Sequence, residues 1–318
     1  MNNMVDNSIN FNIKSYKNPC SKNSGRIKEG TSFANFMLYF FAVLICIVTL
    51  YPFYYVVIMS ISSPIKAASM DVYLYPKGLT LGSYRLIVRD SKMWWAYMNT
   101  LIYVICGTFL TLLTSILGAY PLSVRNLAGR KWLVSYLIIP MYFGGGLIPT
   151  FLLINKLGLY NTRWAIIIPG AVSIWYIILV RTYFITIPDS MKESAFIDGA
   201  NHFQLLFKIV VPVSKPILAV ISIYTIVGIW NSWFSALVYL PNEMLHPLQM
   251  YLYRVLVQQT VDLKELAFDE MAEAAEMIFT NMQLKYSIIV FTTLPIIFTY
   301  PFFQKYFIKG VMLGSLKG

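Results

Sequence analysis

Residues 93–124 read MWWAYMNTLIYVICGTFLTLLTSILGAYPLSV and contain no charged side chain. A membrane-spanning helix needs about 20 mostly apolar residues, and this stretch exceeds that length. Five more uncharged stretches predict further spans, at residues 34–61, 132–155, 164–180, 216–240 and 286–304. The stretch 164–180 is short and contains Pro169 and Gly170, so a re-entrant segment is the alternative there. We predict an all-α integral membrane protein with six transmembrane helices.

The composition of the 318 residues agrees with this fold class. Apolar residues make up 58% and charged residues 12%, against roughly 25% charged residues in a soluble domain. The mean hydropathy is +0.62. The net charge of +11 therefore does not indicate a nucleic-acid partner, because basic residues in membrane proteins concentrate in cytoplasmic segments.

The distribution of Lys and Arg predicts the orientation. With the N-terminus in the cytoplasm, fifteen of the 25 basic residues lie in cytoplasmic segments, as the positive-inside rule requires. Residues 1–33 then form a cytoplasmic tail ahead of a six-span membrane domain at 34–318. The cytoplasm also contains the loop 181–215 and the tail 305–318, and the loop 241–285 lies outside. The outside segment 62–92, with five basic residues, runs against the rule.

Other function classes lack their required residues. Residues 25–30 give Gly, four residues and Gly, but no Lys follows, so the chain has no nucleotide-binding P-loop. The two histidines, His202 and His246, are not in a metal-binding pattern. The span cores contain no charge, whereas ion-coupled carriers commonly place an ionisable residue there. We therefore expect neither a catalytic site nor a metal or cofactor bound by this chain.

The cytoplasmic loop contains the most specific pattern, within RTYFITIPDSMKESAFIDGANHFQLLFKIVVPVSKP at 181–216. Ser190 followed by Glu193 predicts a capping box at a helix start. Gly199 suits the left-handed residue that ends this helix, and Asn201 can cap a second short helix. The pattern predicts two short helices that meet at Gly199, and a purely structural surface role is one explanation of it.

This loop resembles the "EAA" loop of permease subunits of bacterial ABC importers. The family pattern is Glu-Ala-Ala, three residues, Gly, nine residues, Ile, and Pro three positions later. The matching residues are Glu193, Ser194, Ala195, Asp198, Gly199, Ala200, Ile209 and Pro212, with Ser194 in place of the middle Ala.

The resemblance extends from about residue 34 to residue 318. Residues 304–310 (QKYFIKG), 314–318 (GSLKG), 51–53 (YPF) and 231–234 (NSWF) are similar to carbohydrate permeases of the maltose-importer type with six spans. Residues 143–150 (FGGGLIPT) and 158–162 (GLYNT) resemble a branch linked to polysaccharide-derived and uronate-containing oligosaccharides.

The resemblance implies a type I ABC importer permease in a bacterial cell membrane. It implies a heterodimer with a second homologous permease, two ATP-binding subunits that use ATP and Mg²⁺, and an extracytoplasmic solute-binding protein. The EAA loop would insert into the ATPase and couple its closure to alternating access, and the cargo would be an oligosaccharide. An acidic stretch with helical spacing at 265–279 is explained equally by contact with the binding protein and by a solvated helix.

Polar and aromatic residues in or beside the spans are candidates for the cargo path, although each is more often a packing residue. They are Asn99, Tyr142, Tyr176, Trp230, Asn231 and Trp233. Two alternatives remain open, an ABC importer permease for a non-sugar solute and an ATP-independent membrane carrier.

Overall fold

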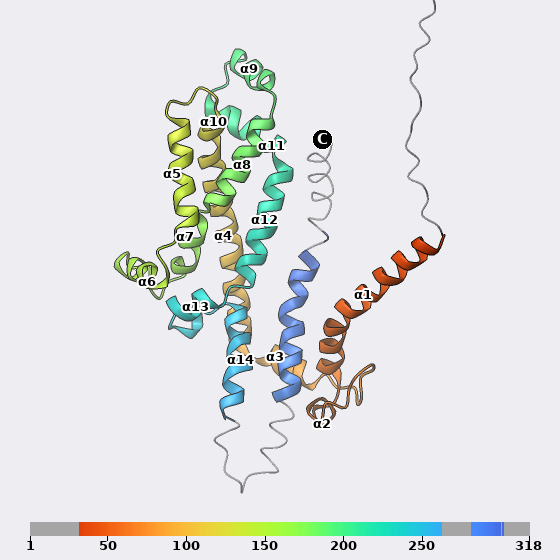
Figure 1. Cartoon of the computed structure of the whole chain (residues 1–318). Helices are drawn as coiled ribbons and strands as arrows, with labels where there is room; N and C mark the ends of the chain where they lie inside the picture. The colour runs from red at the N-terminus through yellow and green to blue at the C-terminus, as the bar shows by residue number, and fades with distance from the viewer. Residues whose placement is uncertain (1–31, 263–280, 300, 302–318) are drawn as a thin grey trace, which may run out of the picture. The chain divides into compact units, whose positions relative to one another are not determined.

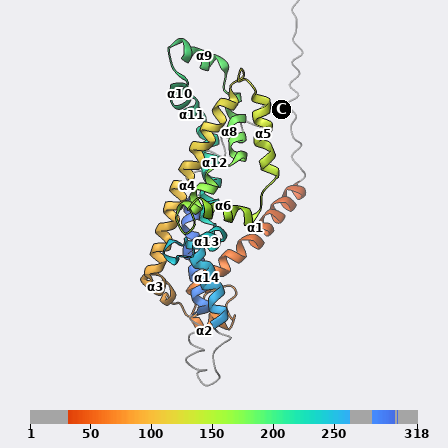
Figure 2. The same ribbon diagram turned by 90° about the vertical axis from the view of Figure 1, so that its left-hand side faces the viewer.

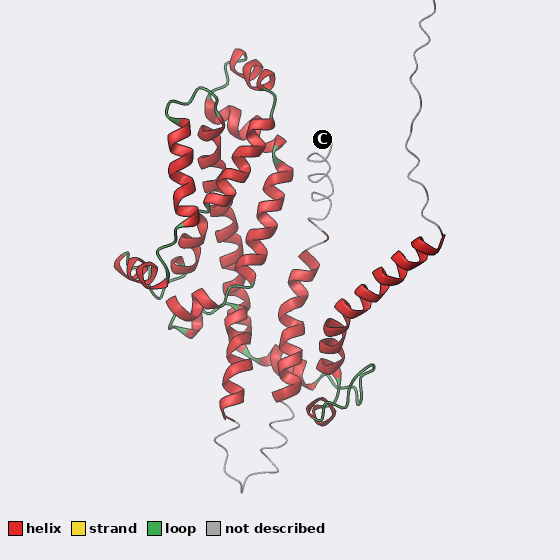
Figure 3. Cartoon of the chain, viewed as in Figure 1, coloured by secondary structure: helices red, strands yellow, loops and turns green. Residues whose placement is uncertain are grey.

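The structure is a computed structural model that describes residues 32–262, 281–299 and 301 (Figure 1). Every regular element in these residues is helical (Figure 3). The chain divides into two compact units at Pro52, within α1 (Ser32–Ile61). In the first unit, the side chains described from residue 33 onward are exposed although most are apolar. Such a surface requires lipid or another apolar partner.

The second unit contains the other helices of the described residues. They are α2 (Pro64–Ala68), α3 (Gly82–Arg89), α4 (Ser91–Ser123), α5 (Arg130–Tyr142), α6 (Leu147–Lys156), α7 (Trp164–Ala171), α8 (Ile174–Thr186), α9 (Asp189–Ile197), α10 (His202–Leu205), a π-helix (Leu206–Val210), α11 (Val211–Val213), α12 (Lys215–Trp230), α13 (Phe234–Tyr239), a 3₁₀ turn (Glu243–Leu245), α14 (Leu248–Asp262) and the helix Asn281–Thr299.

Helix α4 is the axis of this unit, and α7, α8 and α12 pack along it (Figures 1 and 2). Small residues allow the close approach. A Cβ added at Gly107 would lie 2.5 Å from Cδ1 of Ile229 on α12. One added at Gly118 would lie 3.2–3.3 Å from three side-chain atoms of Ile177 on α8. Membrane helices pack in this way because no hydrophobic effect drives their association within lipid.

Within the described residues, three helices are long and apolar enough to cross a membrane, and up to six spans result if each of three bent helix pairs counts as one. The three are 35–61 of α1, α4 and the helix Asn281–Thr299. They correspond to the first, second and sixth predicted spans. The predicted total of six stays a prediction, because it depends on how the bent pairs are counted.

The third predicted span, at 132–155, is sharply bent in the structure. Helix α5 ends at Tyr142, α6 begins at Leu147, and the two helices are bent by 111° (Figure 3). The glycines at 144–146 separate them, and Gly146 has a φ of 83°, which favours glycine. Together the two helices remain long and apolar enough to form one bent span.

The fourth and fifth predicted spans are also interrupted. Helices α7 and α8 are bent by 43° after Ala171, and α8 continues through Arg181 to Thr186. Helix α12 ends at Trp230, so the predicted continuation to residue 240 is wrong; a break at 231–233 precedes α13. The acidic helix predicted at 265–279 and the tail 305–318 lie outside the described residues.

Candidate functional site

Residues 189–213, here called the knob, project from one end of the bundle (Figure 1). Helix α9 begins at Asp189 after the N-cap Pro188. The predicted capping box at Ser190 and Glu193 is therefore wrong, because both residues lie inside the helix and Ser190 is not its N-cap. Asp189 stabilises this end instead: it pairs with Arg125 Nη1 at 3.1 Å and with Lys192 Nζ at 3.3 Å.

The turn after α9 has the geometry predicted from Gly199. Its φ is +81°. The Gly199 N–H donates to the Phe196 carbonyl at 3.0 Å, and the Ala200 N–H donates to the Ala195 carbonyl at 2.9 Å. This pair of bonds is a Schellman motif, which satisfies carbonyls at a helix end. A Cβ added at Gly199 would meet no atom within 4 Å, so the backbone conformation alone requires glycine here.

The second half of the knob begins at Asn201, as predicted. Its side chain accepts from the Gln204 N–H at 2.8 Å, and Gln204 Oε1 accepts from the Asn201 N–H at 3.0 Å, which completes a capping box. Helix α10 leads into the π-helix, which contains Ile209, and then into α11. Pro212 has no N–H to donate to the carbonyl four residues earlier, and the π-helix, whose turn is wider than that of an α-helix, lies directly before α11.

The inner face of the knob belongs to the core of the bundle. Ala195, Leu205, Leu206 and Val210 are buried in one cluster with residues of α4, α8 and α12. Partly buried Ile209 and Ala200 pack against the same cluster. Any displacement of the knob therefore acts directly on the helices that form the bundle.

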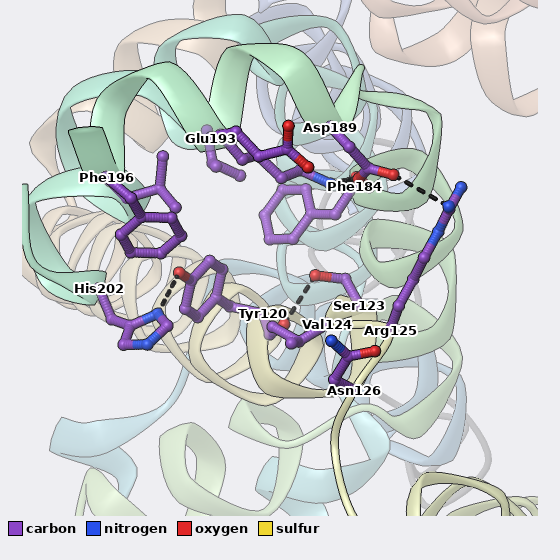
Figure 4. A pocket seen from close by; sticks show the side chains of 13 residues that line it. Tyr120, Ser123, Val124, Arg125, Asn126, Phe184, Asp189, Glu193, Phe196 and His202 are labelled. Carbon is purple, nitrogen blue, oxygen red and sulfur yellow. Dashed lines mark hydrogen bonds and ion pairs between the residues drawn. The ribbon is translucent and has the colours of Figure 1, made fainter. Parts of the chain in front are cut away.

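A cavity of about 270 Å³ separates the knob from the end of α4 (Figure 4). On one side, Tyr120 Oη and His202 Nδ1 are hydrogen-bonded at 3.0 Å. The His202 ring packs edge-on against Phe196, with the ring centroids 5.1 Å apart. The Arg125–Asp189 pair closes the other side. Sequence reasoning missed Tyr120, Arg125 and His202, because their partners lie far away in the chain.

The outer face of the knob is apolar and acidic. Ile197 is 86% exposed and Phe203 is 70% exposed, and Phe207 and Met191 are also exposed. Glu193 and Asp198 are exposed in the same segment, and neither forms a salt bridge with a described residue; Glu193 also lines the cavity. A patch of large apolar side chains rimmed by charge is typical of a protein-binding surface.

Some predicted cargo-path residues make their hydrogen bonds within the chain. The Asn99 amide nitrogen donates to the Met244 and His246 carbonyls at 2.7 and 3.2 Å, and its oxygen accepts from Arg163 at 3.0 Å. Trp230 is 4% exposed, and its indole N–H donates to the Thr292 carbonyl at 3.1 Å. Both side chains are therefore engaged within the chain in this structure, and their role in the cargo path stays a prediction.

The other cargo-path candidates are accessible. Tyr142 is 73% exposed and Tyr176 is half-buried. Asn231 is exposed, with its Oδ1 atom 3.4 Å from Gln249 Nε2. Trp233 is 36% exposed and stacks on Tyr253 with 4.4 Å between ring centroids. These residues are not gathered in one described cavity, and their role in the cargo path stays a prediction.

A polar network surrounds the 3₁₀ turn, far from the knob (Figure 1). Glu243 pairs with Arg254 at 2.7 Å and with Lys92 at 3.5 Å. The hydrogen bond and charge of Arg254 lower the pKa of Glu243. Burial lowers the pKa of His246, whose Nε2 atom lies 2.7 Å from the Leu240 carbonyl oxygen. Asp90 accepts from the Tyr251 hydroxyl at 2.6 Å. Sequence reasoning missed this network.

In the described ranges, no group of three or more His, Cys, Asp or Glu side chains could hold a metal ion. Long apolar helices, with an exposed two-helix knob continuous with their core, indicate an integral membrane protein. The chain belongs to the family of the "Binding-protein-dependent transport system inner membrane component", whose characteristic sequence matches residues 41–313. The predicted class, a permease subunit of an ABC importer with an all-α membrane fold, is thereby confirmed.

Relatives and a solved structure agree with this family. The chain is 35% identical to the Protein LplC of Bacillus subtilis (strain 168), over 85% of this chain and 90% of that protein. It is 33% identical to the "Polygalacturonan/rhamnogalacturonan transport system permease protein YtcP" of the same organism, over 89% of this chain and 97% of that protein. It superposes with a TM-score of 0.78 and 33% identity on a bacterial ABC transporter "involved in the import of the acidic polysaccharide alginate", covering 86% and 96% of the two chains.

Proposed function

We propose that this permease couples a cytoplasmic ATPase to the import of oligosaccharides through the knob. The observation that supports the coupling role is the contrast between its two faces. The inner face is fixed in the bundle core by Leu205, Leu206 and Val210, whereas the outer face exposes Ile197 and Phe203. A rigid element with one buried and one unpartnered apolar face transmits displacement from a partner to the helices.

The partner face fits a groove with apolar and basic residues. Phe203 and Ile197 supply the apolar contacts, and Glu193 and Asp198 supply the negative charge. In the assembly, a second permease completes the pathway and two ATPase subunits bind ATP and Mg²⁺. The knob and both termini then lie in the cytoplasm, and the network around Glu243 faces a solute-binding protein outside.

The relatives support an oligosaccharide as the cargo. YtcP is described as a permease for polygalacturonan and rhamnogalacturonan, and the solved transporter is described as an importer of alginate. Both descriptions concern acidic polysaccharides or galacturonans. The cargo proposed here is an oligosaccharide with uronate residues, delivered by the binding protein.

Site-directed cross-linking tests the coupling role. In a variant with its three cysteines replaced by serine, Ile197→Cys or Phe203→Cys is joined to the co-expressed ATPase by a short thiol reagent. The matched control is Leu79→Cys, because Leu79 is 74% exposed and belongs to the segment between α2 and α3, two helices at the other end of the bundle from the knob (Figure 1). We expect cross-links to the ATPase from the knob positions only. Equal yields from all three positions, or none from the knob, contradict the coupling role.

Uptake competition tests the cargo. Membrane vesicles with the assembled importer are given a labelled oligogalacturonide, and unlabelled uronate or neutral oligosaccharides compete with it. We expect competition by uronate oligosaccharides alone. Equal competition by neutral oligosaccharides contradicts the acidic cargo, and the absence of any sugar uptake contradicts the oligosaccharide assignment.

A further inference from the structure

A second cavity, of about 900 Å³, is lined by residues at the start of α5. Helix α5 begins at the same end of the bundle as the knob (Figure 2). Arg125, Arg130, Lys131 and Arg181 line it, with Trp132 and Ser135. We call it the basic cavity. Its residues come from the segment after α4, from α5 and from α8, so three parts of the chain converge on it.

The positive charge of the basic cavity is largely uncompensated. No acidic residue of the described chain lines it. Arg125 pairs with Asp189 of the knob, but Arg130, Lys131 and Arg181 have no carboxylate within 4.0 Å among the described residues. Arg181 is held in place because its Nε donates to the Leu122 carbonyl at 3.0 Å. Like charges held together repel each other, so an anion between them stabilises this arrangement.

An apolar surface continues from the basic cavity along α5. Trp132 is 83% exposed, Tyr136 is 71% exposed and Ile139 is 57% exposed. No residue of α5 is buried. Tryptophan and tyrosine favour the boundary between lipid headgroups and hydrocarbon. The cavity thus joins a cluster of cations to a surface suited to acyl chains.

We propose that the basic cavity binds the phosphate headgroup of an anionic phospholipid, with its acyl chains along α5. Guanidinium groups bind phosphate through paired hydrogen bonds, and basic pockets beside membrane helices bind anionic headgroups. A free phosphate would satisfy the charges but leave the α5 surface uncovered. An acidic protein segment would bring carboxylates but no acyl chain. The combination of the two features favours the lipid.

The site is independent of the coupling role proposed above, although the two share one residue. Arg125 lines the basic cavity and also closes the knob cavity through Asp189. A bound lipid therefore contacts the residue that pairs with the first turn of α9. Binding of the lipid is measured without ATP or cargo, so its failure is distinct from failure of coupling.

Native mass spectrometry of the full chain, purified with its co-expressed partners, tests the proposal. Phosphatidylglycerol and phosphatidylcholine are titrated separately into the detergent solution. The variant Arg130→Gln/Lys131→Gln removes two charges from the cavity. The control Arg85→Gln/Arg89→Gln removes two exposed charges from α3, far from the cavity. About five-fold weaker binding is expected for each cavity charge removed, so the first variant should bind phosphatidylglycerol about 25-fold more weakly and the control should be unchanged.

Several outcomes overturn the proposal. Equal binding of the two lipids by the wild-type chain excludes selectivity for an anionic headgroup. Equal losses in both double variants show a general effect of charge. Displacement of the lipid by inorganic phosphate at millimolar concentration assigns the cavity to a small anion. If the double variant does not assemble, Arg130→Lys keeps the charge but loses the paired hydrogen bonds, and unchanged phosphatidylglycerol binding by that variant contradicts guanidinium recognition.

Discussion

Substitution of Gly199 tests whether the angle within the knob couples the ATPase to the bundle. The residue has a φ of +81°, and an added Cβ would meet nothing within 4 Å. A side chain at this position therefore costs backbone free energy without a steric clash. Asparagine tolerates the left-handed region, alanine adopts it at a cost, and a β-branched valine is a strong outlier there.

The cost of the left-handed conformation sets the expected magnitude. An L-residue pays roughly 1–2 kcal/mol in this region, which corresponds to a 5- to 30-fold shift in the equilibrium between the native turn and its opened forms. The buried residues of the knob, such as Leu205 and Val210, stay in the core. Gly199→Ala should therefore lose part of the coupling, and Gly199→Val most of it, while the protein still folds.

The assay is cargo uptake and ATP hydrolysis by the assembled importer in vesicles. We expect uptake in the order glycine, asparagine, alanine, valine, with at least a ten-fold loss for Gly199→Val and hydrolysis no longer stimulated by the loaded binding protein. The matched control is Gly158→Val, because Gly158 has a φ of +69° and an equally open environment but lies between α6 and α7.

Two results would refute this reasoning. Normal uptake by Gly199→Val shows that the turn geometry does not control coupling. Equal losses in Gly158→Val and Gly199→Val, with reduced amounts of assembled complex in both, show a general loss of stability. Similar uptake by the asparagine and valine variants also contradicts an explanation based on φ.

Three further predictions concern stability. Tyr120→Phe removes the hydrogen bond to His202 at a cost of about 1 kcal/mol. We expect faster amide hydrogen exchange confined to residues 189–205, and unchanged exchange there would contradict a role of Tyr120 in stabilising the knob. Gly107→Ala should destabilise the bundle by about 1–3 kcal/mol through overpacking against Ile229. In thermal unfolding, the added substitution Ile229→Val, which removes the clashing Cδ1 atom, should recover part of this loss. If the two substitutions destabilise the protein in a strictly additive way, the clash is excluded as the cause. Burial lowers the pKa of His246, so as the pH falls the unfolded chain takes up a proton at this residue before the folded chain does. The contribution of neutral His246 to the free energy of unfolding is therefore fully present above about pH 6.5 and is lost as the pH falls below that value. Hydrogen exchange at 240–257 should rise over that range in the wild type but not in His246→Asn, and equal rises in both exclude this histidine.

The sequence predicted the knob well because its geometry depends on neighbouring residues. Gly199 ends α9 through bonds to Ala195 and Phe196, and Asn201 caps α10 through Gln204. The start of α9 was placed wrongly, because Asp189 is stabilised by Arg125 from the segment after α4. A carboxylate at the first turn of a helix is favourable in itself, but its partner lies 64 residues away in the chain.

The breaks in the helices were harder to predict than the apolar stretches. Uncharged composition identifies a segment that can enter a membrane, but continuity depends on the backbone of single residues. Gly146 adopts a left-handed φ between α5 and α6, and Asn231 and Trp233 lie in the break between α12 and α13. Neither break changes the apolar composition, so span prediction by composition passes through both.

The candidate cargo path shows why polar residues in apolar stretches are ambiguous. Asn99 has the same local sequence signature whether it faces a sugar or holds a loop, and its partners are 64 to 147 residues away. Because a buried amide requires hydrogen bonds, its three partners explain its presence without any cargo. Tyr142 and Trp233 differ, because their side chains remain accessible in this chain. A sugar needs both an accessible aromatic face and unshared polar atoms, so the search for cargo contacts should begin at the accessible side chains, while the role of Asn99 and Trp230 in the cargo path stays a prediction.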